Sequence, residues 1–232
     1  MIKKTIIDVM CGRFVFTDPS RIKSLLPDAV IDDQVVMEFR PSYNIAPSQP
    51  VPAMLNDQTR SIRLTRWGLI PSWSKSKDTG FNLINTRLES LFEKPMFRVL
   101  AQKRRCLIFA DGFYEWQKVG RRKQPYFIRR ADRQPMAFAG LWDTWEKQGD
   151  SIISSSIITT TASSQLAPIH DRMPFIMPPQ LYADWLSSSA IPSQALQRCL
   201  MDASLDPLEF YAVSALVNTP VNNGPECIRP LV

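Results

Sequence analysis

The chain has few cysteines, few glycines, a single histidine and no long hydrophobic run. No apolar stretch approaches the roughly 18 residues of a transmembrane helix, so we expect no membrane partner. The four cysteines lie far apart without a CxxC spacing, so we expect neither a zinc site nor a disulfide framework. With 8 glycines against 19 prolines, many connections should be stiff and extended.

The 232 residues do contain the apolar material for a core. Hydrophobic residues make up 44% and aromatic residues 10% of the chain, which excludes a disordered protein. The first ten residues have neither the apolar stretch nor the cleavage site of a signal peptide, so we expect a cytoplasmic protein with reduced thiols. Without repeats, low-complexity tracts or linkers, one α+β domain fits best.

Short apolar or alternating runs dominate the chain and predict strands. The expected strands are 11–16, 106–110, 112–117, 125–130, 136–141, 152–161 and 210–217, with a hairpin formed by 51–55 and 61–67. We expect loops over 40–52 and 68–80. The expected helices begin after Thr17, occupy 88–102 with an interruption near Pro95, and span 179–187 and 193–201.

The net charge of +6 is unevenly distributed. Three basic clusters crowd the middle of the chain, at 103–105, 121–123 and 129–130. A solvated surface and a single face that binds a polyanion both account for them. The sequence leaves that choice open.

Cys11 directly follows Met10, and this context changes what the cysteine can do. An internal cysteine at the start of a strand is most simply a small buried hydrophobe. Removal of an initiator Met10 would instead leave Cys11 with a free α-amine beside its thiol. The α-amine has a pKa of about 7.8 against about 10.4 for lysine, so roughly a tenth is neutral at pH 7. Such an amine attacks an aldehyde to form an imine, and the thiol then closes a five-membered thiazolidine.

Three further segments contain residues suited to acid–base chemistry or binding. His170, the only histidine, lies in a proline-bounded loop, where it could be structural or functional. Strand alternation places Phe113 and Glu115 on one face, with Tyr114 on the other, so Glu115 is either a surface carboxylate or an acid/base. Asn85 precedes an arginine by two residues and could position a phosphate or carbonyl, or simply begin a helix.

These pieces occur together, and in this order, in one known family. The matching segments are CGRF at 11–14, YNIAP at 43–47, RWGLIPSW at 66–73, NTR at 85–87, ADGFYEW at 110–116, PYFI at 125–128 and IHDRMP at 169–174, with VNN at 221–223 and PLV at 230–232. The chain resembles the SOS response-associated peptidase (SRAP) family, the HMCES/YedK-type proteins that process abasic sites in single-stranded DNA. The resemblance spans nearly all of residues 11–232.

The resemblance implies a reaction and a set of site residues. It implies that Cys11 is the nucleophile that forms a covalent thiazolidine crosslink with the ring-opened abasic site, shielding the lesion in the DNA damage (SOS) response. Asn85 would hold the α-amine, and Glu115 and His170 would act as acid and base. The positions implied to contact DNA are Arg13, Asn44, Pro47, Trp73 and Arg87. The implied fold is one compact α+β domain with a curved, mostly antiparallel, barrel-like sheet, flanked by short helices and bearing a positively charged channel. The family has no metal or organic cofactor, and we expect a monomer.

Two features depart from the family pattern. Residues 1–10 would block the amine of Cys11, which an early start codon, proteolytic removal or an inactivating tail would explain. We favour the early start codon and expect residues 1–10 to be absent from or removed in the active form. Ser74 stands where some members have a second tryptophan.

Two other functions remain open from the sequence. A thiol peptidase would pair Cys11 with His170 and would need no free amine. A non-catalytic binder of single-stranded DNA would bind reversibly and would not depend on Cys11. The crosslinking hypothesis predicts an enzyme of lyase or hydrolase type, with self-processing peptidase activity as a further implication of the family name.

Overall fold

The core of the protein is a closed, five-stranded barrel. The computed structural model describes residues 11–57, 59–78, 83–147, 149–189, 200 and 207–231. Around the barrel, β11 (Asp150–Thr161) pairs with β10 (Met136–Lys147), then follow β7 (Arg105–Ala110), β4 (Pro50–Leu55) and β5 (Ser61–Trp67). Strand β5 closes the barrel by pairing in parallel with β11, whereas the other pairs are antiparallel.

Three short strands extend the barrel sheet. Strand β2 (Val30–Ile31) pairs in parallel with β5, and β6 (Asn85–Arg87) pairs in parallel with β11. Strand β12 (Arg172–Pro174) pairs antiparallel with β11. Because β6 and β12 both lie along β11, segments around Asn85 and His170 are held close to one strand.

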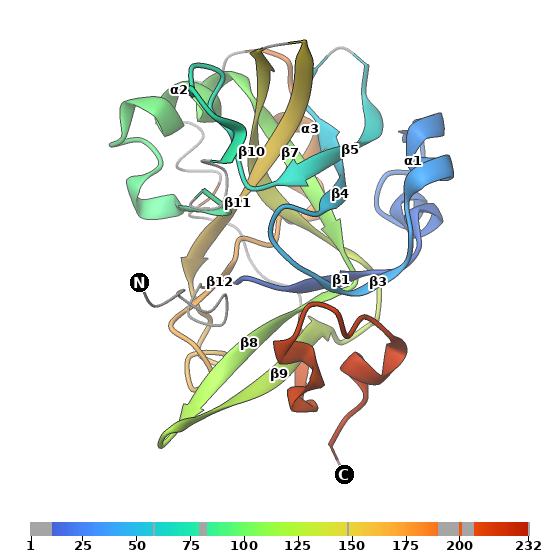
Figure 1. Ribbon diagram of the computed structural model, residues 1–232, viewed down its shortest axis with the longest axis vertical. Coiled ribbons are helices and arrows are strands. Elements are labelled where there is room, and N and C mark those ends of the chain that lie inside the picture. The colour runs from blue at the N-terminus through green and yellow to red at the C-terminus, as the bar shows by residue number, and fades with distance from the viewer. Residues whose placement is uncertain are drawn as a thin grey trace.

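A second, antiparallel sheet packs beside the barrel (Figure 1). Its order is β13 (Leu208–Ala212), β9 (Arg122–Arg130), β8 (Gly112–Val119), β1 (Phe14–Phe16) and β3 (Ser42–Ile45). Phe14, Phe16 and Phe113 point into the main core, while Val15 and Tyr114 point into a smaller core on the other side. The alternation predicted for 112–117 is therefore confirmed, and the sheet separates two apolar layers.

The helices are short and lie around the sheets. They are η2 (Pro19–Ser24), α1 (Asp33–Glu38), η4 (Leu88–Ser90), α2 (Pro95–Lys103), η5 (Pro179–Leu181), α3 (Tyr182–Trp185), η6 (Ala215–Asn218) and η7 (Pro225–Ile228). The expected α+β class, with a barrel-like sheet flanked by short helices, is confirmed. Among the described residues, none of the helices has the length and apolar character needed to cross a membrane.

Several local predictions were wrong. The loop expected over 40–52 contains β3 and the start of β4. Pro50 and Pro52 fit this strand because β4 pairs with β7 only from Ala53 onward, so no ladder bond to β7 needs their missing N–H groups. Pro95 begins α2, where its fixed φ suits a first turn, and does not interrupt a helix.

Other element boundaries differ in detail. The first helix begins after Thr17 as predicted, with Asp18 as its cap, but it is a 3₁₀ helix. The last strand ends at Ala212, after which Ser214 caps η6, so the prediction of a strand to 217 was too long. The helix expected over 193–201 lies outside the described residues, apart from Leu200.

Candidate functional site

Cys11 lies against Glu115 at the edge of the second sheet. The backbone N–H of Cys11 donates a hydrogen bond to Glu115 Oε1 at 2.8 Å. The antiparallel pairing of Phe14 with Phe113, extended by the bond from Tyr114 N–H to the Arg13 carbonyl oxygen (3.0 Å), aligns the two residues. The Cys11 side chain is buried, and its φ of +43° is in the left-handed region that non-glycine residues rarely adopt.

The buried environment shifts the protonation of both groups. Burial raises the pKa of Glu115 from 4.5 to about 8, the hydrogen bond from Cys11 opposes this rise, and the negative charge of Asp171 adds to it. Burial, and next the charge of Glu115, raise the pKa of the Cys11 thiol well above its usual value. The site therefore contains a carboxyl group that holds its proton near neutral pH and a thiol that is not ionised.

Asn85 reaches Cys11 from the neighbouring strand β6. Its Nδ2 donates to the carbonyl oxygen of Cys11 at 3.5 Å, whereas the nitrogen of Cys11 is bonded to Glu115. Strand β6 is held by pairing with β11 and by a hydrogen bond between the hydroxyls of Thr86 and Ser156 (3.0 Å). The structure thus brings Asn85 to Cys11, but at the carbonyl end of the residue and not at the amine that the resemblance implies.

The loop that contains His170 packs against β8. Gln117 Nε2 donates to the Pro168 carbonyl oxygen at 3.0 Å, two residues beyond Glu115 on the same strand. His170 Nδ1 lies 3.1 Å from the backbone nitrogen of Arg172 and 3.0 Å from Asp171 Oδ1. The ring nitrogen therefore accepts from the Arg172 N–H and lies beside the Asp171 carboxylate.

Trp73, Arg87 and Pro47 are accessible. Trp73 is 71% exposed, Arg87 is exposed, and Pro47 is half-buried in the turn after β3. The Trp73 loop is anchored to β10, because Trp145 Nε1 donates to the Ser74 carbonyl oxygen at 2.9 Å. Ser74 itself is buried, so it takes no part in the exposed surface beside Trp73.

Arg13 and Asn44, the other two residues implied to contact DNA, are buried. Arg13 donates to Asn44 Oδ1 and to the Val217 carbonyl oxygen, each at 2.8 Å. Asn44 Nδ2 donates to the carbonyl oxygens of Val217, Thr219 and Asn222. These side chains tie the strands beside Cys11 to the C-terminal segment, which is a structural task.

Apart from the exposed Lys103, two of the three basic clusters are neutralised or buried. The ion pairs are Arg104–Asp143, Arg129–Glu209 and Arg130–Asp132. Arg105 is fully buried and donates to backbone carbonyl oxygens, including that of Trp185 at 2.7 Å. Only the cluster at 121–123 is fully exposed, so the three clusters do not form one polyanion-binding face.

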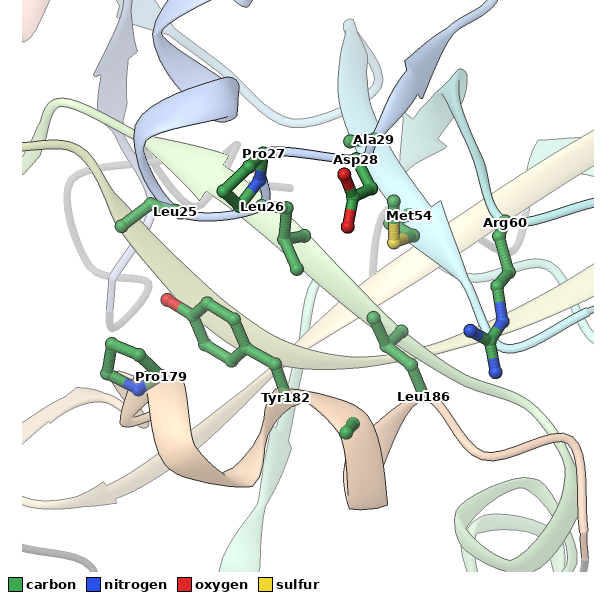
Figure 2. A pocket seen from close by; sticks show the side chains of 11 residues that line it. Leu25, Leu26, Pro27, Asp28, Ala29, Met54, Arg60, Pro179, Tyr182 and Leu186 are labelled. Carbon is green, nitrogen blue, oxygen red and sulfur yellow. The ribbon is translucent and has the colours of Figure 1, made fainter.

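Two pockets differ in character. A cavity of about 330 Å³ lies between residues 25–29, β4 and α3, with a chiefly apolar lining in which Asp28 and Arg60 are the charged residues (Figure 2). It contains none of the expected site residues. A polar pocket of about 570 Å³ is lined by Arg87, Glu89, Ser90, Glu93, Lys94, Thr161 and Arg172. It includes Arg87, one of the residues expected to contact DNA, but its lining is mixed in charge, because Arg172 is ion-paired with Glu89.

Sequence reasoning missed the buried hydroxyls that position the site. Thr65 Oγ1 and Ser155 Oγ are 2.8 Å apart, and Ser154 Oγ accepts from the Ile70 N–H at 2.8 Å. The first bond joins β5 to β11, and the second joins the loop that leads to Trp73 to β11. The signal was the run of serines and threonines inside an otherwise apolar strand, since buried hydroxyls require partners.

Fold and site together define a class of protein: a barrel with an attached antiparallel sheet, in which a buried carboxyl group is hydrogen-bonded to the nitrogen of a cysteine just before β1. Among the described residues, no group of three or more His, Cys, Asp or Glu side chains could hold a metal ion. The sequence model of the SOS response associated peptidase (SRAP) family matches residues 10–220, and the chain belongs to this family.

Relatives cover nearly the whole chain. Abasic site processing protein YoqW of Bacillus subtilis is 39% identical over 224 residues, covering 95% of this chain and 99% of that protein. Abasic site processing protein HMCES of Xenopus tropicalis is 30% identical, covering 84% of this chain and 68% of its own length. A solved structure from Bacteroides thetaiotaomicron shares the fold with a TM-score of 0.82 at 24% identity, covering 96% of this chain and all of that one.

Proposed function

We propose that this protein captures abasic sites in single-stranded DNA. The capture uses the α-amine and thiol of Cys11 in a form of the chain that begins at Cys11, without residues 1–10. The observation that carries the proposal is the 2.8 Å hydrogen bond between the Cys11 nitrogen and the buried Glu115 carboxyl. Relatives named as abasic site processing proteins align over almost the whole chain, which supports DNA with abasic sites as the partner.

The reaction begins at the sugar. Opening the ring breaks the bond between C1′ and the ring oxygen and exposes an aldehyde, and we assign the acid–base role in this step to His170. The neutral amine of Cys11 attacks the aldehyde carbon, and the carbinolamine loses water to give an imine. Glu115, whose pKa is raised by burial, donates the proton to the departing hydroxyl group, and its carboxylate then takes up the proton that the nitrogen loses as the imine forms.

The thiol completes the capture. It adds across the carbon–nitrogen double bond, so that a sulfur–carbon bond forms and the thiol proton moves to the nitrogen. The product is a thiazolidine, and the whole sequence releases one water. Asn85, bonded to the Cys11 carbonyl oxygen, fixes the orientation of the residue while its two nucleophiles react.

The protonated thiol favours crosslinking over a thiol peptidase. A cysteine peptidase needs a thiolate as its first nucleophile. Here burial and Glu115 both raise the thiol pKa, which opposes ionisation. In the proposed reaction the α-amine attacks the aldehyde first. No thiolate is needed for this step, because the thiol acts only after the imine has formed.

The exposed surfaces support DNA as the substrate. Trp73 offers a face on which a base can stack, and Arg87 lines the polar pocket. We keep the expectation that the protein acts as a monomer in the cytoplasm, at the nucleoid when it is bound to DNA.

The test compares a chain that begins at Cys11 with the full 232-residue chain. Each is incubated with a single-stranded oligonucleotide containing one abasic site, and the products are analysed on denaturing gels and by intact mass. We expect the Cys11-first chain to give a species equal to protein plus oligonucleotide minus one water. The full chain should give none, because its Cys11 nitrogen is an amide.

Matched variants separate the steps. Cys11→Ser in the Cys11-first chain keeps the amine, so it should form an imine that borohydride traps, but no stable adduct without reduction. An oligonucleotide with a tetrahydrofuran abasic analogue has no aldehyde and should not react. An unreduced adduct that survives in Cys11→Ala, or one formed with tetrahydrofuran, would refute the proposal.

A further inference from the structure

The loop that carries Trp73 is held by one face of β10. Side chains alternate along a strand, so Asp143, Trp145 and Lys147 lie on the same face. Each of them bonds to the backbone of one loop residue. These bonds run from the Ser72 N–H to Asp143 Oδ2 (2.8 Å), from Trp145 Nε1 to the Ser74 carbonyl oxygen (2.9 Å) and from Lys147 Nζ to the Trp73 carbonyl oxygen (3.3 Å). Three consecutive loop residues are therefore fixed through their backbone.

Asp143 ties this loop to the end of α2. Its side chain is buried, and its two oxygens have different partners: Oδ1 accepts from Arg104 Nη1 at 2.5 Å, and Oδ2 accepts from the Ser72 N–H. Arg104 directly follows α2 and lies over the ring of Trp142, 5.0 Å from its centroid. A buried carboxylate has lost its hydration and needs such partners. The carboxylate therefore connects the loop backbone to a cation that is itself packed in place.

The anchored backbone leaves the Trp73 side chain in the open. Trp73 is 71% exposed, whereas Ser74 beside it is buried. A base that stacks on a ring carried by a loose loop must also order that loop. Ordering the backbone of one residue lowers an equilibrium constant by a factor of about five to thirty. A loop that is ordered in advance avoids this cost, so the anchors favour binding through the ring.

We infer that Asp143 is a positioning residue for DNA binding. It holds the Ser72 backbone so that the Trp73 ring presents its face to a base of the single strand. Asp143 is buried and does not contact the DNA, so its effect is transmitted through Trp73. The inference rests on the proposed function for the stacking role of Trp73, and it adds the contact that fixes the place of the ring.

A double-mutant cycle in the full chain tests this. The unmodified protein is compared with Asp143→Ala, Trp73→Ala and the double variant. Binding to an undamaged single-stranded oligonucleotide of about 15 nucleotides, close to the upper site size of single-strand binders, is measured by fluorescence anisotropy. Asp143→Ala should weaken binding about fivefold where Trp73 is present and less than about twofold in the Trp73→Ala background. Without the ring, the loop has nothing to position.

A matched variant controls for charge. Asp143→Ala removes a negative charge, which by itself would strengthen binding to DNA. Glu209→Ala removes a negative charge from another arginine ion pair, Arg129–Glu209, in the second sheet. This control should bind the oligonucleotide at least as tightly as the unmodified protein. The weakening expected for Asp143→Ala is therefore opposite in sign to the charge effect.

Two further measurements separate positioning from loss of the fold. Trp145→Phe changes no charge but removes the bond to the Ser74 carbonyl oxygen, so it should weaken binding about twofold, again only where Trp73 is present. Hydrogen–deuterium exchange of Asp143→Ala should become faster in peptides that cover 68–74, while β4 and β7 keep their protection. Urea unfolding shows how much of each variant is folded in the binding experiment.

The cycle gives a clear decision. An equal loss of affinity in both Trp73 backgrounds would show that Asp143 acts through the fold as a whole and would overturn the inference. No loss in Asp143→Ala, or the same loss in Glu209→Ala, would overturn it as well. If Asp143→Ala does not fold, the cycle of Trp145→Phe with Trp73→Ala decides in its place. Failure of the proposed function would appear separately, as absence of the covalent adduct in the unmodified Cys11-first chain.

Discussion

Replacing Glu115 by glutamine in the full chain should change stability in a pH-dependent way. Glutamine keeps the size of the side chain and an oxygen that can accept the Cys11 N–H, so the chief change is loss of the titrating group. Burial raises the folded-state pKa of Glu115 from 4.5 to about 8. Between these values the folded protein binds more protons than the unfolded chain, so the free energy of unfolding falls as pH rises.

The magnitude follows from the shift. A difference of about 3.5 pKa units corresponds to about 5 kcal/mol at pH values above 8, because one unit is worth about 1.4 kcal/mol. The unmodified protein is free of this penalty below pH 4.5 and bears all of it above pH 8. The free energy of unfolding of Glu115→Gln minus that of the unmodified protein should therefore increase by about 3 kcal/mol as the pH is raised from 6 to 9.

Urea unfolding followed by tryptophan fluorescence at pH 6, 7.5 and 9 measures the effect. Glu89→Gln is the control: the hydrogen bond from Arg172 lowers the pKa of Glu89, so its contribution is complete above the unfolded value and should be constant over this range. A Glu115→Gln difference that stays constant from pH 6 to pH 9 would refute the reasoning, since a carboxyl with an ordinary pKa is already ionised throughout.

Three other substitutions test separate parts of the structure. Asn44→Ala should lower the free energy of unfolding by about 3 kcal/mol in urea, since it removes the three hydrogen bonds from Asn44 to carbonyl oxygens and the one that Asn44 accepts from Arg13, each worth about 1 kcal/mol; an unchanged stability with weakened DNA binding would contradict this structural role. Trp73→Ala should weaken binding to undamaged single strands by about 1–3 kcal/mol in anisotropy titrations while leaving the melting temperature unchanged. Gly140→Ala should cost about 1–3 kcal/mol in thermal unfolding, because its Cβ would lie 2.8 Å from Cys106 Sγ and 3.0 Å from the Ser156 carbonyl oxygen.

Local patterns predicted the parts of the fold that local chemistry decides. Alternation assigned Glu115 to the face opposite Tyr114 because a strand between two apolar layers has period two. The prolines at 50 and 52 misled the prediction, since the sequence does not say where the pairing of β4 with β7 begins. Barrel closure by β5 and β11 joins strands far apart in the chain and leaves no local mark.

In the candidate site, too, the sequence predicted what depends on local chemistry and not what depends on contacts between distant segments. Cys11, Glu115 and His170 could be selected by residue type and context, and the structure brings Cys11 and Glu115 into contact. The burial of Arg13 could not be foreseen, because its partners are backbone carbonyl oxygens about 200 residues away. An arginine that binds carbonyl groups and one that binds phosphates look alike in a sequence.

The backbone at Cys11 offers a last test of whether the fold is adapted to an amine at this position. In the full chain Cys11 has a φ of +43°, which costs a non-glycine residue about 1–2 kcal/mol. A first residue has no preceding carbonyl, so this cost disappears when the chain begins at Cys11. Glycine at position 11 should therefore be more stable than alanine by about 1 kcal/mol in the full chain, with little difference in the shorter one. Urea unfolding of the four proteins measures this, and an equal preference in both chains would show that the left-handed conformation is unrelated to the residues before Cys11.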